Sequence, residues 1–228
     1  MRIVICFITS LLFTVKQIAA QEFVKDSLIF NDDFNKARTD HWIIEKTDSA
    51  QEKAIIENGK LLFDTYGGVT AWYKQELSGN YYIRFKRTII MKGGKNDRVS
   101  DCNLFWMATD PLHNKLFQRK GAFNEYDSLS MYYVGMGGNY NSTTRFRKYD
   151  GKGDKKILGE FTDSPHLLQA NKEYLFEIIV KNGTTQFKVD GQVYFSFTDP
   201  QLLTHGWFAF RSTRSRQEID DLEIWRIH

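Results

Sequence analysis

The stretch YLFEIIVKNGTTQFKVDGQVYFSF, residues 174–197, decides the fold class. Asn182-Gly183 and Asp190-Gly191 divide it into three apolar-rich runs of strand length. Asn-Gly and Asp-Gly pairs accept positive φ at low cost, as a two-residue β-hairpin turn requires. The stretch therefore predicts an antiparallel meander with strands over 174–181, 184–190 and 193–197.

The same rhythm of short strands and turn residues recurs along the chain, without a sustained helical period. It predicts an all-β, two-sheet antiparallel jelly-roll sandwich in which Leu28 and Phe30 lie beside Leu222 and Ile224. One turn of helix is expected over 200–204. The other strands are expected over 27–31, 42–46, 53–57, 60–64, 69–74, 80–91, 102–108, 128–134, 143–149, 206–212 and 219–227.

Residues 1–20 have the layout of a secretory signal, with a positive start, an apolar run over 3–15 and small residues before Gln21. The run is too short for a bilayer core of roughly 30 Å. We therefore expect export to the periplasm or the medium, no membrane insertion, and a single jelly-roll domain over 21–228.

The net charge and the cysteine count exclude nucleic-acid binders and disulfide-stabilised domains. Without Arg2 and Lys16, 29 of the 31 basic residues remain against 28 acidic ones, which excludes the basic stripe of a nucleic-acid binder. Cys102 becomes the only cysteine, so we expect no intramolecular disulfide. We expect its thiol to be buried. We expect a monomer without a cofactor.

Alternation in three strands separates a core face from an opposite face. The core face carries Ile83, Phe85, Ile89, Phe146, Phe208 and Phe210. The opposite face carries Arg84, Arg145, Arg147, Tyr149, Trp207 and Arg211. In one concave sheet, such guanidinium groups would fork onto sugar carboxylates while the aromatic rings stack on pyranose faces. The ordinary alternative is a solvated strand face with arginines paired to carboxylates.

The most unusual segment is YYVGMGGNYN, residues 132–141. Its glycines allow close backbone approach to a ligand, and Asn139 and Asn141 suit sugar hydroxyls. The alternative interpretation is a glycine-rich hairpin with asparagines for turn geometry. No phosphate loop is present, because no Lys-Ser/Thr pair follows and no helix opens there.

Histidine and acidic residues offer fewer sites. His113 and His205 are expected in loops, where His113 is placed to act as a base. Neither histidine has a zinc-ligand spacing. Asn31-Asp32-Asp33 offers oxygens for a structural calcium ion, although Asp at a strand end is usually a turn residue.

Several quoted segments resemble a known family. FNDDF over 30–34, DCNLFWMATDP over 101–111 and the segment over 132–147 are similar to a bacterial jelly-roll family of the concanavalin A-like lectin/glucanase superfamily, associated with polysaccharide degradation. The strands over 206–211 and 219–224 resemble the last two of many such domains. The resemblance implies a concave carbohydrate-facing sheet. It implies no particular reaction, because the superfamily includes lyases, hydrolases and binding modules.

A pair of carboxylates for glycoside hydrolysis would lie about 5–10 Å apart. Glu125 and Asp127 have a spacing that would place both on one strand face. The longer acidic motif of retaining jelly-roll glucanases is incomplete, because Ser130 occupies its third acidic position. A structural role beside Arg119 or Lys120 is favoured.

The leading hypothesis is a polysaccharide lyase or glycoside hydrolase for an acidic or rhamnose-containing polysaccharide. Arg145 or Arg147 would neutralise a uronate carboxylate, and Tyr133, Tyr149 or His113 would transfer protons. The alternatives are a non-catalytic, lectin-like protein with the same groove and a β-sandwich without a glycan ligand. The predicted substrate contacts are Arg84, Trp106, Asn139, Asn141, Trp207 and Arg211.

Overall fold

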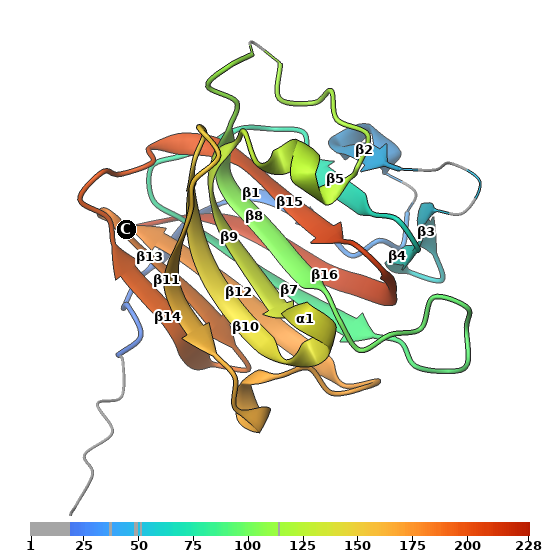
Figure 1. The fold of residues 1–228 in the computed structure, drawn as a ribbon. Helices are drawn as coiled ribbons and strands as arrows, with labels where there is room; N and C mark the ends of the chain where they lie inside the picture. The colour runs from blue at the N-terminus through green and yellow to red at the C-terminus, as the bar shows by residue number, and fades with distance from the viewer. Residues whose placement is uncertain (1–18, 37, 48–49, 51, 114) are drawn as a thin grey trace, which may run out of the picture.

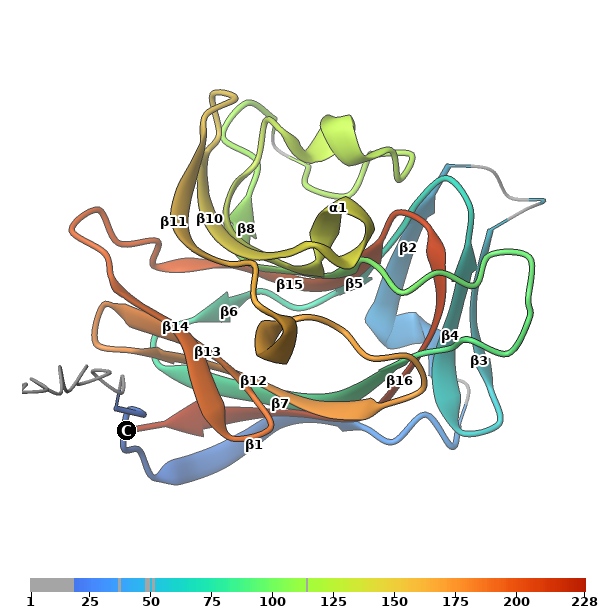
Figure 2. The same ribbon diagram turned by 60° about the horizontal axis from the view of Figure 1, so that its bottom comes forward.

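The computed structural model describes residues 19–36, 38–47, 50, 52–113 and 115–228. Most of the predicted signal therefore lies outside the described residues. Two antiparallel sheets of eight strands pack face to face (Figure 1 and Figure 2), which confirms the predicted sandwich. No helix within the described ranges is long and apolar enough to cross a membrane.

Sheet A has the order β14-β13-β12-β7-β16-β4-β3, and β1 also pairs with β16. Its strands are β1 Lys25–Asp32, β3 Lys53–Glu57, β4 Lys60–Thr65, β7 Tyr81–Ile89, β12 Glu173–Lys181, β13 Thr184–Val189, β14 Gln192–Thr198 and β16 Ser215–Ile227. Sheet B has the order β11-β10-β9-β8-β15-β5-β2, and β6 pairs with β15. Its strands are β2 Trp42–Lys46, β5 Val69–Tyr73, β6 Leu77–Ser78, β8 Cys102–Thr109, β9 Ser130–Gly137, β10 Thr143–Asp150, β11 Lys155–Phe161 and β15 His205–Ser212.

Short helical turns occupy four of the connections between the strands. They are η1 Thr39–His41, η2 Phe123–Tyr126, α1 Gly138–Asn141 and η3 Ser164–His166.

The turns follow the residues predicted for them. Asn182 and Gly183 have φ of 49° and 79° and join β12 to β13, as the opening stretch predicted. The first and last strands pair, with Phe30 opposite Ile224. The helical turn predicted over 200–204 is wrong: the segment forms only a non-helical turn, in which Asp199 accepts a hydrogen bond from the Gln201 amide, before β15 begins.

The main core lies between the sheets and contains all six residues predicted for the core face. An arginine shares this space. Arg87 of β7 is 1% exposed, and its guanidinium donates to the Asn103 and Arg211 carbonyls of sheet B at 3.0 and 2.9 Å. These bonds satisfy the buried cation and join the two sheets behind the strands that carry the site.

The outer face of sheet B carries a second apolar cluster. The connection from β8 to β9, here called the β8–β9 loop and described over 110–113 and 115–129, lies over this face (Figure 2). Leu116, Tyr126 and Leu129 of the loop pack against Trp72 and Phe105 of the sheet. The loop therefore covers the outer face over β5, β15 and β8 and reaches Tyr133 of β9 through Phe123, while Arg145 and Arg147 of β10 stay partly exposed.

Candidate functional site

A hollow of about 230 Å³ lies on the uncovered part of sheet B, at the end where β9 turns through α1 into β10. We call it the arginine pocket. It is lined by Asp101, Asn103, Phe123, Tyr133, Gly135, Gly138, Asn139, Thr143, Arg145, Arg147 and Thr213. The structure thus brings together Tyr133, Asn139, Arg145 and Arg147 of the predicted site residues.

The two arginines of β10 project on the same side but differ in their partners. Arg145 forms an ion pair with Glu160, its register partner on β11. The Arg147 guanidinium lies 5.7 Å from the centre of the Tyr133 ring. Among the described residues no carboxylate forms an ion pair with Arg147, so its charge faces the pocket without a counterion.

Tyr133 is held as a hydrogen-bond donor. Its hydroxyl donates to Asn103 Oδ1 at 3.0 Å, and its side chain is almost fully buried. Burial raises the pKa of Tyr133, and the positive charges of Arg147 and Arg211 offset only part of this shift. The phenol is therefore protonated at neutral pH and is suited to give a proton rather than to take one.

Gly135 makes room for that hydroxyl. A Cβ atom at this position would lie 2.3 Å from Tyr133 Oη and 3.0 Å from Asn103 Oδ1. The glycine therefore serves the close approach of a side chain, where the sequence suggested close approach of a ligand.

Asp101 is a pocket residue that the sequence interpretation missed. It precedes β8 with φ of 70°, and its carboxylate accepts hydrogen bonds of 3.3 Å from Arg98 Nη2 and the Thr213 amide. Asn103, Phe123 and Thr213 were also missed. For Asp101 and Asn103, the one available signal was their place in the 101–111 segment that carries the family resemblance.

Cys102 follows Asp101 and faces the main core, as predicted. Its thiol is 1% exposed and lies 3.9 Å from Gln217 Oε1. Burial raises the pKa of the Cys102 thiol to about 11, so it is not an activated nucleophile.

Two residues predicted to act in catalysis lie elsewhere. Tyr149 has no exposed surface, and burial raises its pKa to about 12 against the charge of Arg147. His113 is exposed in the β8–β9 loop, where its Nδ1 contacts Asp110, and it does not line the pocket. The structure does not support either residue as a base at this pocket.

Three residues predicted to contact the substrate do not line the pocket, because they are buried or lie on the other sheet. Trp106 points into the main core and stacks on Phe146 at 5.6 Å, because β8 is apolar on both faces and its alternation was not readable. Arg84 lies on β7 of sheet A, beside Glu223. Arg211 has the predicted face but no exposed surface: it lies under Phe123 and donates to the Gly121 carbonyl at 3.0 Å. The four predicted arginines therefore form no single cationic floor.

The remaining predicted residues have structural contacts. Trp207 packs edge-on against Phe117, and Nε1 donates to the Lys74 carbonyl. Asn141 exchanges hydrogen bonds with the Leu168 backbone at 2.9 Å. His205 was expected in a loop but is the first residue of β15, where it pairs with Ser78 of β6 and contacts Glu76.

The acidic pair has the structural role that was favoured. Glu125 accepts hydrogen bonds from the Lys120 and Ala122 amides, and Asp127 pairs with Lys155 at 2.6 Å. At the suggested calcium turn, the Asp32 carboxylate accepts hydrogen bonds from the Phe34 amide and from Trp42 Nε1. Calcium binding there stays a prediction.

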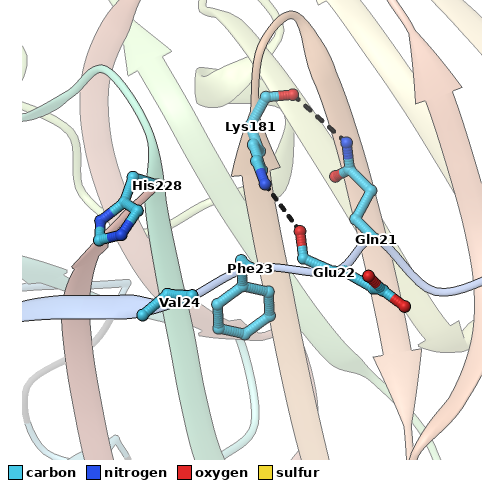
Figure 3. Close-up of a pocket in the computed structure, with 6 residues that line it drawn as sticks. All are labelled: Gln21, Glu22, Phe23, Val24, Lys181 and His228. Atoms are coloured by element: carbon cyan, nitrogen blue, oxygen red, sulfur yellow. Dashed lines mark hydrogen bonds between the residues drawn. The ribbon is translucent and has the colours of Figure 1, made fainter.

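A larger hollow of about 580 Å³ lies where the start of the described chain crosses sheet A (Figure 3). Gln21 Nε2 donates to the Lys181 carbonyl, and Lys181 Nζ donates to the Glu22 carbonyl at 2.7 Å. Phe23 packs against Tyr82, with ring centres 4.8 Å apart and ring planes tilted by 41°. These contacts fix the chain start and leave the lysine occupied, so the arginine pocket is the better site.

Solved structures support the fold. A protein of unknown function with a galectin-like fold from Bacillus subtilis is 15% identical with a TM-score of 0.72, covering 90% of this chain and 99% of that chain. An endo-β-1,3-glucanase from Pyrococcus furiosus is 11% identical with a TM-score of 0.62, covering 92% and 99%. The carbohydrate-binding module CBM66 from Bacillus subtilis is 10% identical with a TM-score of 0.56, covering 81% and 95%.

At these low identities the TM-scores show a shared fold and nothing beyond it. No curated protein matches the sequence. One family model matches residues 63–222, which run from within β4 to within β16 and contain every residue that lines the arginine pocket. The chain belongs to the family described as Domain of unknown function (DUF6250).

Proposed function

We propose that this protein binds an acidic carbohydrate and that the arginine pocket holds a sugar carboxylate. The observation that carries the proposal is Arg147, a partly exposed guanidinium without a carboxylate partner among the described residues. A guanidinium presents paired N–H groups that match the two oxygens of a carboxylate. The endo-β-1,3-glucanase and the carbohydrate-binding module among the similar folds support a carbohydrate as the ligand.

The rest of the pocket suits a sugar ring. Phe123 and Tyr133 supply aromatic surface, while Asn103, Asn139 and Thr143 supply polar groups for hydroxyls. We also propose that the protein acts outside the cytoplasm, because residues 1–20 have the layout of a signal. The proposed functional form is a monomer.

Hydrolysis by two carboxyl groups is not the function that this geometry favours. Asp101 is the one carboxylate among the lining residues described, and a hydrolase of the usual kind needs two. A lyase is the second candidate, because Asp101, protonated Tyr133 and Arg147 line one pocket. In that reaction Asp101 takes the proton from C5, Tyr133 protonates O4 as the C4–O4 bond breaks, and a C4–C5 double bond forms.

Calorimetric titration tests the binding function. Oligosaccharides from pectin, rhamnogalacturonan, ulvan and alginate are compared with the same samples after their carboxyl groups are reduced to alcohols. We expect at least one acidic sample to bind and its reduced form to bind about tenfold or more weakly, the loss of a charge-assisted pair. Equal affinity for the reduced form would contradict carboxylate recognition.

Matched arginine variants place the site. Arg147→Gln should weaken binding about tenfold or more, whereas Arg84→Gln, on the other sheet and beside Glu223, should not change it. The same mixtures, followed at the absorbance of unsaturated uronate, test the lyase. No absorbance change on a polymer that binds would leave binding as the function and remove the lyase.

A further inference from the structure

Phe123 of the β8–β9 loop forms one wall of the arginine pocket. The pocket extends over β10, β9 and β8 of sheet B. The second apolar cluster includes residues of these three strands and continues across β15 and β5. Phe123 belongs to both: it lines the pocket, its ring centre lies 6.0 Å from that of Tyr133, and it packs on the cluster. Phe123, which also lies 4.6 Å from the Arg211 guanidinium of β15, therefore stands between the open hollow and the part of sheet B that the loop covers.

The loop is fixed to the sheet by buried polar contacts. The Glu45 carboxylate is 5% exposed and accepts hydrogen bonds from Trp72 Nε1, Tyr126 Oη and the Arg119 amide at 2.8, 2.9 and 2.7 Å. Arg211 rises from β15 to the Gly121 carbonyl and lies 4.6 Å from the Phe123 ring centre. A segment held by charge-assisted bonds at several points is a rigid wall.

The opposite side of the pocket has no such wall. Beyond β10 lies only β11, the edge strand of sheet B, with Ile157 half exposed. A sugar chain laid across the strands can leave over β11 but meets Phe123 at the other end. The pocket volume of about 230 Å³ is below the roughly 300–1,000 Å³ of sites for drug-sized ligands.

We propose that the arginine pocket is closed at one end and takes the terminal residue of an acidic glycan chain, with Phe123 as the end stop. The proposal rests on the proposed function, since it names which part of the acidic carbohydrate is bound. An internal residue of a polymer would need an exit on both sides, and the anchored loop removes one of them.

Titrations with uronate oligosaccharides of graded length, from the dimer to the polymer, test this with the unaltered protein. We expect affinity per molecule to level off after about two or three sugars, within about twofold from there onward. We expect one protein bound per polymer chain. Binding sites that increase in proportion to chain length would overturn the end-stop proposal and leave the proposed function standing. No binding by any acidic oligosaccharide would overturn the proposed function itself.

Two loop variants locate the stop. Phe123→Ala should weaken binding of the dimer about fivefold or more. Phe117→Ala removes the same ring from the same loop, but its contacts are with Trp72 and Trp207, away from the pocket, and binding should not change. Equal weakening in both variants would show a general effect of loop packing and would overturn the role of Phe123.

Discussion

Arg211 and Arg147 lie on the same face of sheet B in opposite surroundings. Arg211 has no exposed surface and donates to the Gly121 carbonyl and Thr213 Oγ1, whereas Arg147 faces the pocket. Arg211→Gln should lower the free energy of unfolding by about 2–4 kcal/mol, because it leaves buried acceptors without a donor. Arg147→Gln should change it by no more than about 0.5 kcal/mol. Urea denaturation measures both, and equal stability of the two variants would contradict these assignments.

The close approach of Tyr133 to Gly135 predicts that a side chain at position 135 lowers the stability of the protein. Gly135→Ala places a methyl group 2.3 Å from the Tyr133 hydroxyl and should destabilise the protein by about 1–3 kcal/mol through overpacking. Tyr133→Phe removes the nearest clashing atom and leaves the ring carbon at 2.9 Å, so the double variant should be more stable than the sum of the two single effects predicts. Strictly additive losses in urea denaturation would mean that the clash is relieved elsewhere.

At the scale of elements, the β8–β9 loop depends on Glu45. A glutamine there keeps the size of the side chain but replaces one acceptor oxygen by an N–H₂ donor. That group then faces either the Arg119 amide or the Trp72 and Tyr126 donors. Glu45→Gln should cost about 1–3 kcal/mol and should speed hydrogen exchange over residues 115–129. Exchange in the β12–β13–β14 meander serves as the control. Unchanged exchange in the loop would show that the apolar contacts alone hold it.

The strands show how far the sequence predicts this molecule. Hairpin turns and alternation predicted most strands, because both are local properties of a sheet with one buried face. Strand β11 was missed, since an exposed edge strand with the sequence KKILGEF has weak alternation. The two-residue β6 is too short for any pattern.

The site was predicted in part for the same physical reason. Arg145 and Arg147 alternate with Phe146 in one strand, so their shared face was readable. The burial of Arg211 was not, because Gly121 and Phe123 cover it from 90 and 88 residues away in the chain. Alternation assigns a face to a side chain, but it does not tell whether a distant loop covers that face.

At the scale of the whole molecule, buried tyrosines determine how the free energy of unfolding changes at alkaline pH. Burial raises the pKa of four tyrosines to about 12: Tyr73, Tyr149, Tyr174 and Tyr194. In the unfolded chain a tyrosine ionises near pH 10. The stabilisation from their raised pKa is therefore complete below pH 10 and is lost as the pH rises from 10 to 12.

Each such tyrosine should lower the free energy of unfolding by up to about 1.4 kcal/mol per pH unit in this window. Urea denaturation between pH 8 and 12, with phenolate absorbance recorded on the same samples, measures the effect. Phenolate absorbance from these buried rings at pH 10 in fully folded protein would contradict it.

The labelling rate of the buried Cys102 thiol reports how often strand β8 opens. A thiol reagent can reach it only when β8 separates from its neighbours, so the labelling rate at fixed pH counts openings of the strand that carries Asn103. A ligand bound in the adjacent pocket should lower the labelling rate of Cys102 by the factor with which it stabilises the closed strand. Occupancy of a site on the outer face then becomes readable from chemistry in the core, without a label on the sugar.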